Sequence, residues 1–214
     1  MKESPGVVDL LGVLAYAELS AFARMTEDAA SLAPSLADRA ALSELALAEY
    51  AHFRLLRDQL AELGADPEEA MSPFVEALDG WHTQTAPGDW LEALVKAYVG
   101  EGIAFDFYRE AAKRLDPPLA KLVDQVLADE GRSEFAVERV RAALEADPVA
   151  AGRLALWARR LVGEALSQGQ RVAASRPELA RMLVSADADD QAEISRMFAR
   201  LTEEHGKRMT ALGL

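Results

Sequence analysis

One ten-residue stretch, "LAEYAHFRLL" at residues 47–56, constrains the fold of this chain more than any other. Its composition is that of a continuous helix, on which Glu49 and His52 lie three residues apart on the same face. That face also carries Leu42 and Leu56, at the spacing of a buried apolar seam. A helix that places a carboxylate and an imidazole among buried leucines needs something that compensates for their burial.

The rest of the chain is helical in pattern as well. It is rich in Ala, Leu, Glu and Arg and shows no alternating strand pattern, which predicts an all-α protein. Helix starts are marked by an N-cap side chain followed by proline. These pairs are Ser4-Pro5, Asp66-Pro67, Asp116-Pro117 and Asp147-Pro148, and capping-box spacing joins Ser35 with Asp38 and Asp89 with Glu92.

These signals predict a series of long helices joined by turns. The expected ranges are 5–31, 35–63, 89–115, 117–146, 148–175 and 187–212, with a short helical piece at 178–184. The connection 64–88 is long enough to cross the length of a bundle. Two hairpins joined by one long crossover are typical of ferritin-like four-helix bundles. We therefore expect a single domain over 1–214, with a four-helix core at 5–146 and two accessory helices at 148–212.

The other three core helices also carry a carboxylate in the middle of the apolar seam. These residues are Glu18, Glu101 and Glu130. Four carboxylates buried at one depth are very unfavourable unless protons, an inward-facing cation or metal ions neutralise them. A pair of divalent metal ions, bridged by glutamates and completed by imidazoles, neutralises them efficiently.

With Glu18 and Glu101 as single glutamates and "EYAH" as a Glu-x-x-His motif, the chain resembles the ferritin-like superfamily. Its di-iron and di-manganese members take one Glu from each of two helices and a Glu-x-x-His from each of the other two. More narrowly, the chain is similar to actinobacterial ferritin-like proteins related to the MiaE-type tRNA hydroxylases. The likeness continues through "RRLVGEALSQ" and "RMTALGL". It implies a non-haem site for iron, or alternatively manganese, held by Glu18, Glu49, His52, Glu101 and Glu130.

The fourth core helix departs from this motif. In "LADEGRSEF", Ser133 stands three residues after Glu130, and Arg132 stands three residues after Asp129. We favour Glu130 as the inward residue, because this register keeps the valines of the helix in the seam. In either register the second histidine is absent, and serine is a poor ligand for a divalent transition metal. Arg132 could instead lie among the carboxylates as a fixed cation.

The resemblance implies a di-iron oxidoreductase, specifically a MiaE-like hydroxylase with a degenerate second motif. The alternative is a metal-poor or metal-free scaffold or interaction protein without redox activity. Iron storage is a third and weaker hypothesis, because no feature indicates a cage. tRNA is a possible partner only because the resemblance implies it. The alanine-rich outer faces of the helices are compatible with a homodimer.

The net charge and the absence of cysteine exclude or disfavour several classes of function. The 214 residues carry a formal net charge of −13, which argues against broad binding to nucleic acid or anionic membranes. The absence of cysteine excludes disulfides, thiolate metal sites and thiol catalysis. Asp9 and Glu18 interrupt the apolar N-terminal stretch, so we expect neither a signal peptide nor a membrane span, and a cytoplasmic protein.

A local basic segment stands out in this acidic chain. Its arginines are Arg153, Arg159, Arg160, Arg171, Arg176 and Arg181. We expect them to form salt bridges with the acidic remainder or with a partner subunit. A phosphate-binding face for a nucleotide or tRNA is less favoured, because only Trp157 is interleaved for base stacking.

The remaining candidates are interpreted as structural. We expect His82 and Trp81 to pack on the bundle surface, His205 to be a structural histidine, and Glu164 to be a packing or surface residue. The aromatic residues expected in the core are Tyr98, Phe105 and Tyr108.

Overall fold

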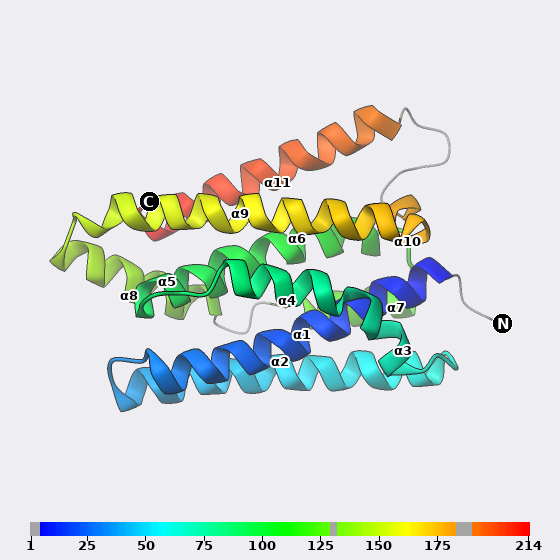
Figure 1. Ribbon diagram of the computed structural model, residues 1–214, viewed down its shortest axis with the longest axis horizontal. Helices are drawn as coiled ribbons and strands as arrows, with labels where there is room; N and C mark the ends of the chain where they lie inside the picture. Colours follow the sequence, from blue (N-terminus) through cyan, green and yellow to red (C-terminus); the bar gives the residue numbers. More distant parts are fainter. Residues whose placement is uncertain (1–4, 129–131, 183–189) are drawn as a thin grey trace.

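A computed structural model describes residues 5–128, 132–182 and 190–214. The side chains of residues 101, 132, 133, 190–195 and 198 also lie outside this description. Throughout the described ranges the chain is helical and contains no strand, which confirms the all-α prediction. The helices follow the long axis of the molecule, with α1 (Pro5–Ser31) and α2 (Leu36–Glu62) along one side and α9 (Ala150–Ser175) along the other (Figure 1).

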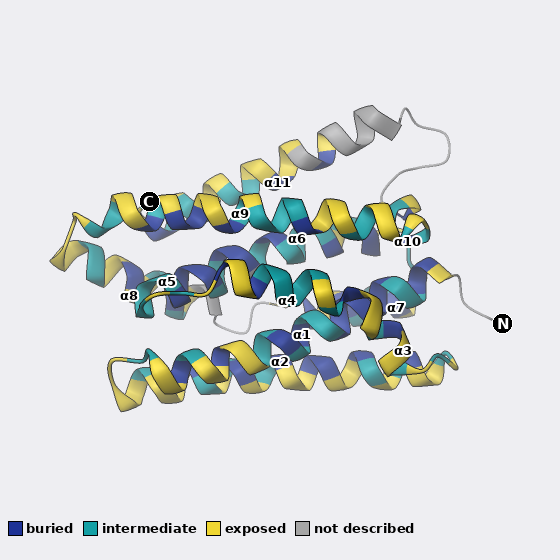
Figure 2. Ribbon diagram, in the orientation of Figure 1, coloured by how far each residue is buried: buried dark blue, intermediate teal, exposed yellow. Residues whose placement is uncertain are grey.

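The α1–α2 hairpin matches its predicted bounds to within one residue at each end. The Ser35 hydroxyl oxygen accepts a hydrogen bond from the Asp38 amide at 3.0 Å, which starts α2 as the capping box predicted. Leu10, Leu14 and Leu56 are fully buried on the facing sides of the two helices. Figure 2 shows exposed residues on the outward sides of α2 and α9 and buried residues toward the interior.

One helix of the described chain, α1, is long and apolar enough to cross a membrane by length and composition. Half of its most apolar window, 50%, is buried inside the fold. A core helix of a soluble protein has the same properties, so this single helix is weak evidence for a membrane span.

The crossover between the two hairpins is itself helical. It contains α3 (Pro67–Met71), the short 3-10 turn η1 (Ser72–Phe74) and α4 (Val75–Gln84). A Cβ on Gly12 would lie 2.2 Å from the Ala70 carbonyl oxygen, so glycine is needed where α1 and α3 meet. The Tyr16 hydroxyl donates to Asp79 at 2.9 Å and ties α4 to α1. In this position α4 contacts both α1 and α9.

The second hairpin differs from the prediction of two continuous helices. The expected helix at 89–115 consists of α5 (Trp90–Val95), a π-helical segment η2 (Lys96–Gly100) and α6 (Glu101–Ala112). The expected helix at 117–146 is α7 (Pro117–Val126) followed by a separate α8 (Arg132–Ala146).

A side-chain cap explains where α7 ends. The Arg109 guanidinium donates to the Leu127 carbonyl at 2.8 Å, so a tertiary contact satisfies the oxygen that a continuing helix would use. The Ala128 amide bonds back to the Gln125 carbonyl at 3.3 Å, a tightening typical of a helix terminus.

The C-terminal part consists of α9, α10 (Pro177–Arg181) and α11 (Asp190–Leu212), close to the predicted accessory helices. The Trp157 indole donates to the Glu92 carbonyl at 2.9 Å and fixes α9 against α5. Leu154, Leu161 and Leu212 are fully buried beside Leu94 and Val99. The accessory helices therefore share a core with the second hairpin.

Candidate metal centre and its cavity

Three polar side chains of the α1–α2 hairpin meet in the interior. Glu18, Glu49 and His52 are 2%, 1% and 4% exposed, and one potential ligand atom of each lies within 4.8 Å of the others. His52 Nδ1 is 3.3 Å from Glu18 Oε2. The structure thus brings together two carboxylates and one imidazole, as the seam pattern predicted.

The hairpin geometry explains this convergence. Glu49 and His52 lie on the inner face of α2 because they are three residues apart, and Glu18 faces them from the antiparallel α1. Ala46 and Leu56, a turn away on α2, are buried as well. Apolar neighbours above and below exclude water, so the polar group is held in a medium of low polarity.

A cavity of about 440 Å³ adjoins this group. Residues of α1, α4, η2, α6 and α9 form most of its wall, and Glu18 and Glu49 are part of it. Tyr108 also lines it, and burial together with the Glu18 carboxylate raises the pKa of this phenol. The carboxylates therefore lie next to a space that can hold a small molecule.

A family model described as "Ferritin-like domain, actinomycetes" matches residues 2–186. The chain belongs to this ferritin-like family. No curated protein matches the sequence. The match covers the helices from α1 to α10, and it establishes the ferritin-like fold.

The donor set fits a metal ion of the kind that ferritin-like folds hold. Carboxylate oxygens and imidazole nitrogens are ligands for iron, manganese and zinc. Glu18, Glu49 and His52 supply both types within one buried group. The three residues correspond to one single-Glu position and one Glu-x-x-His position of the four-helix pattern.

The remaining predicted ligands are less fully described. Glu101 begins α6 directly after η2, and its side chain lies outside the described part. Its neighbours Gly100, Ile103 and Ala104 line the cavity, so its backbone lies beside the site. A π-helical turn at this point is notable because such turns are frequent at functional sites.

The α8 side of the predicted site falls on the part that is not described. Asp129 and Glu130 lie outside the described residues, as do the side chains of Arg132 and Ser133. Their role as the second half of the ligand set stays a prediction. The structure does place Arg132 and Ser133 in the first turn of α8.

The prediction that His82 packs on the bundle surface is wrong. His82 is 8% exposed and lines the cavity, with Nε2 3.3 Å from the Ser20 hydroxyl oxygen. Burial, followed by the charge of Lys96, lowers the pKa of His82 to about 3. In the sequence, Phe74, Leu78 and His82 follow one another at intervals of four residues. This helical spacing could have predicted that His82 is buried.

The other predicted structural residues behave more as expected. Tyr108 is buried, and Tyr98 and Phe105 are half-buried against the core. His205, half-buried on α11, is not among the clustered donors of the described residues. Trp81 is half-buried, and its indole donates to the Leu161 carbonyl at 3.4 Å.

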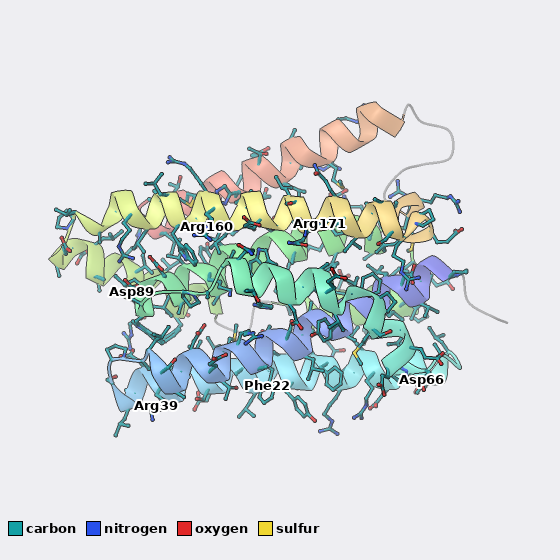
Figure 3. All side chains as sticks on the ribbon, viewed as in Figure 1. Phe22, Arg39, Asp66, Asp89, Arg160 and Arg171 are labelled. Atoms are coloured by element: carbon teal, nitrogen blue, oxygen red, sulfur yellow. The ribbon has the colours of Figure 1, made fainter. Side chains whose placement is uncertain are left out.

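Ion pairs occupy part of the basic segment. Arg153 pairs with Asp89 at 2.8 Å, and Arg176 lies 3.8 Å from Asp9. Arg160, labelled with Arg171 on α9 in Figure 3, donates to the Gln84 carbonyl at 2.7 Å. The pairs of Arg153 and Arg176 agree with the salt-bridge interpretation of the segment, whereas Arg160 binds a neutral carbonyl.

Proposed function

We propose that this protein is a non-haem di-iron oxidoreductase that hydroxylates a small substrate held in the cavity. The observation that carries the proposal is the buried group of Glu18, Glu49 and His52 beside a space of about 440 Å³. Glu101 and Glu130 would complete the ligand set. When bound, two ferrous ions would activate dioxygen and supply two electrons for one turnover, and an external one- or two-electron reductant would return the iron to the ferrous state.

The chain's own residues would hold and isolate the reacting groups. Glu18 contacts His52 and can fix the orientation of its ring, as carboxylates do for metal-bound histidines. The raised pKa of Tyr108 keeps its phenol protonated next to Glu18. A protonated phenol at that point can donate a hydrogen bond to a group in the cavity.

The two metal positions should differ in affinity. The α1–α2 hairpin offers an imidazole and two carboxylates, whereas the sequence near α8 offers Ser133 where the second histidine of the motif would stand. We therefore expect one tightly bound ion and one weakly bound ion.

Anaerobic titration of the metal-free protein with ferrous iron, followed by calorimetry, tests this proposal. We expect one tight site, a weaker second site and, after air is admitted, dioxygen consumption above that of free iron. Magnesium serves as the control ion, because the imidazole suits iron better than magnesium. Failure to bind iron would instead favour the alternative of a metal-free scaffold.

The MiaE-like form of the proposal, with tRNA as the substrate, rests on the sequence resemblance. The net charge of −13 opposes binding to a polyanion. Binding of bulk tRNA at low and physiological salt decides this point. A steep salt dependence would support contacts to phosphates, and binding that is absent at both concentrations would leave a small molecule as the substrate.

A further inference from the structure

The cavity continues well beyond the candidate metal ligands. Its wall includes Val13 and Asp28 of α1, which the rise of a helix places about 22 Å apart along the helix axis. Glu18 lies between these ends, and Glu49 belongs to the same buried group. A space of about 440 Å³ that follows α1 over this length is elongated rather than round.

Most of the wall is apolar and comes from helices that are far apart in the sequence. Ala17 and Ala21 of α1 form part of it, opposite side chains of α6 and α9. The accessory helices contribute as well, through the buried side chains of Leu179 on α10 and of Met197 and Leu201 on α11. A wall of carbon atoms cannot replace the hydration of a charged or strongly polar ligand.

The charged residues near one end of the cavity balance one another. Arg24 pairs with Glu27 at 3.1 Å. Burial raises the pKa of Asp28 to about 6, and the nearby charge of Lys96 opposes that shift. At neutral pH these four side chains are two cations and two carboxylates, so their charges sum to zero. This end of the cavity therefore has no excess charge from these residues to attract an anion or a cation.

Uncharged polar side chains of the wall also have protein partners. The Ser20 hydroxyl donates to the Ala17 carbonyl at 2.9 Å, and its oxygen lies 3.3 Å from Nε2 of His82. His82 is neutral at physiological pH, because burial lowers its pKa to about 3. The Gln168 side-chain oxygen accepts from Arg171 at 3.4 Å. The polar part of the wall is thus largely satisfied within the protein.

We propose that the cavity binds an uncharged molecule with an extended hydrocarbon chain, which lies along α1 with its carbons next to Glu18 and Glu49. A charged ligand would lose its hydration on entry, whereas each buried methylene group of a neutral chain adds to the affinity. As a substrate assignment this rests on the proposed function. As a binding site it does not, because the wall is formed by the protein alone.

Calorimetry on the metal-free protein with octanol, octanoate and octylamine tests the charge of the ligand. We expect octanol to bind more tightly than either charged probe, by about tenfold or more. A charged probe that binds as tightly as octanol would overturn the proposed ligand class. Failure of all three to bind would overturn the site.

Chain length and shape test the elongated form of the cavity. Among linear alcohols, we expect the affinity to rise about threefold to fourfold per added methylene until the cavity is full. Cyclooctanol, which carries the same number of carbons as octanol in a ring, should bind more weakly than octanol. Equal or tighter binding of cyclooctanol, or an affinity that does not change with chain length, would contradict an extended chain.

Variants that fill the cavity locate the ligand. Ala21→Phe should prevent binding of octanol, while Ala51→Phe on the exposed face of α2 should not affect it. If Ala21→Phe fails to fold, Ala165→Phe fills the cavity from α9 and should have the same effect. Octanol binding that persists in a folded filling variant would contradict the location.

The two proposals can fail separately. A protein that binds ferrous iron tightly but not octanol would overturn this inference and leave the di-iron proposal standing. A protein that binds octanol in the cavity but binds no iron would overturn the proposed function and leave the hydrocarbon site standing.

Discussion

The α1–α2 hairpin consists of two uninterrupted helices, whereas the chain from α5 to α8 is interrupted twice. The first hairpin contributes Glu18, Glu49 and His52 to one buried group. The second contains the π-helical turn just before Glu101, and its helix α7 ends at Val126, before the segment 129–131 that lies outside the described residues. The uninterrupted helices thus carry the three described donors, and the interrupted helices belong to the hairpin whose predicted motif lacks its histidine.

This contrast suggests that the two hairpins have different tasks. The first positions polar atoms, which requires rigid elements with fixed spacing. The second contributes η2 and α6 to the wall of the cavity, which α1, α4 and α9 also line. The described donor atoms therefore come from the first hairpin, while both hairpins enclose the cavity. The following experiments test that division.

The largest effect is expected at the first hairpin. Glu49→Gln keeps the shape of the side chain but removes its charge, and we expect ferrous iron to bind about 100-fold more weakly, a loss of about 2.7 kcal/mol. Glu44→Gln, on the exposed face of the same helix, is the matched control and should leave the affinity unchanged. Unaltered affinity in Glu49→Gln would show that the metal binds elsewhere.

A glycine of the π-helical turn tests the second hairpin. A Cβ on Gly100 would lie 2.7 Å from the ring of Trp81, so Gly100→Ala should lower the free energy of unfolding by about 2 kcal/mol. Gly152→Ala is the control, because no heavy atom lies within 4 Å of its added Cβ, and it should raise stability by about 0.5–1 kcal/mol. Urea denaturation measures both, and a neutral Gly100→Ala would mean that the turn tolerates displacement of the indole.

Restoring the missing histidine tests whether the second hairpin still carries a metal position. If Glu130 faces the site, Ser133→His should tighten the weaker ferrous site about tenfold, or about 1.4 kcal/mol. If Asp129 faces the site, Arg132→His should do so instead. Titrations of both variants beside the unaltered protein distinguish the registers. Two equally tight ions in the unaltered protein would contradict the predicted asymmetry.

The pH dependence of stability tests the buried position of His82. Its folded-state pKa of about 3 lies below the ordinary value of 6.5, so the unfolded chain takes up the proton first as the pH falls. This contribution to stability is present above pH 6.5 and is lost on acidification, by about 1 kcal/mol between pH 7.5 and pH 5.5. His82→Phe should remove that loss in thermal melts at the two pH values. Parallel melts of the two proteins would instead indicate an exposed imidazole.

The sequence by itself determined the regular part of the protein. Helical spacing and the capping box at Ser35 act within one or two turns, so the bounds of α1 and α2 could be predicted. The same spacing required Glu49 and His52 to share a face, and the short turn between the helices required Glu18 to oppose them. Local geometry therefore predicted the donor group of the first hairpin.

Only the tertiary structure decided the second hairpin and the cavity. α7 ends where Arg109, from a different helix, donates to the Leu127 carbonyl, and no signal within that segment specifies its partner. His82 and Lys96 are buried because α4 packs against α1 and α9, and η2 packs against α9. Helical periodicity records which residues share a face. It does not indicate which distant element covers that face. The contact with that element determines how deeply the side chains are buried, which charges lie near them and how large the cavity is.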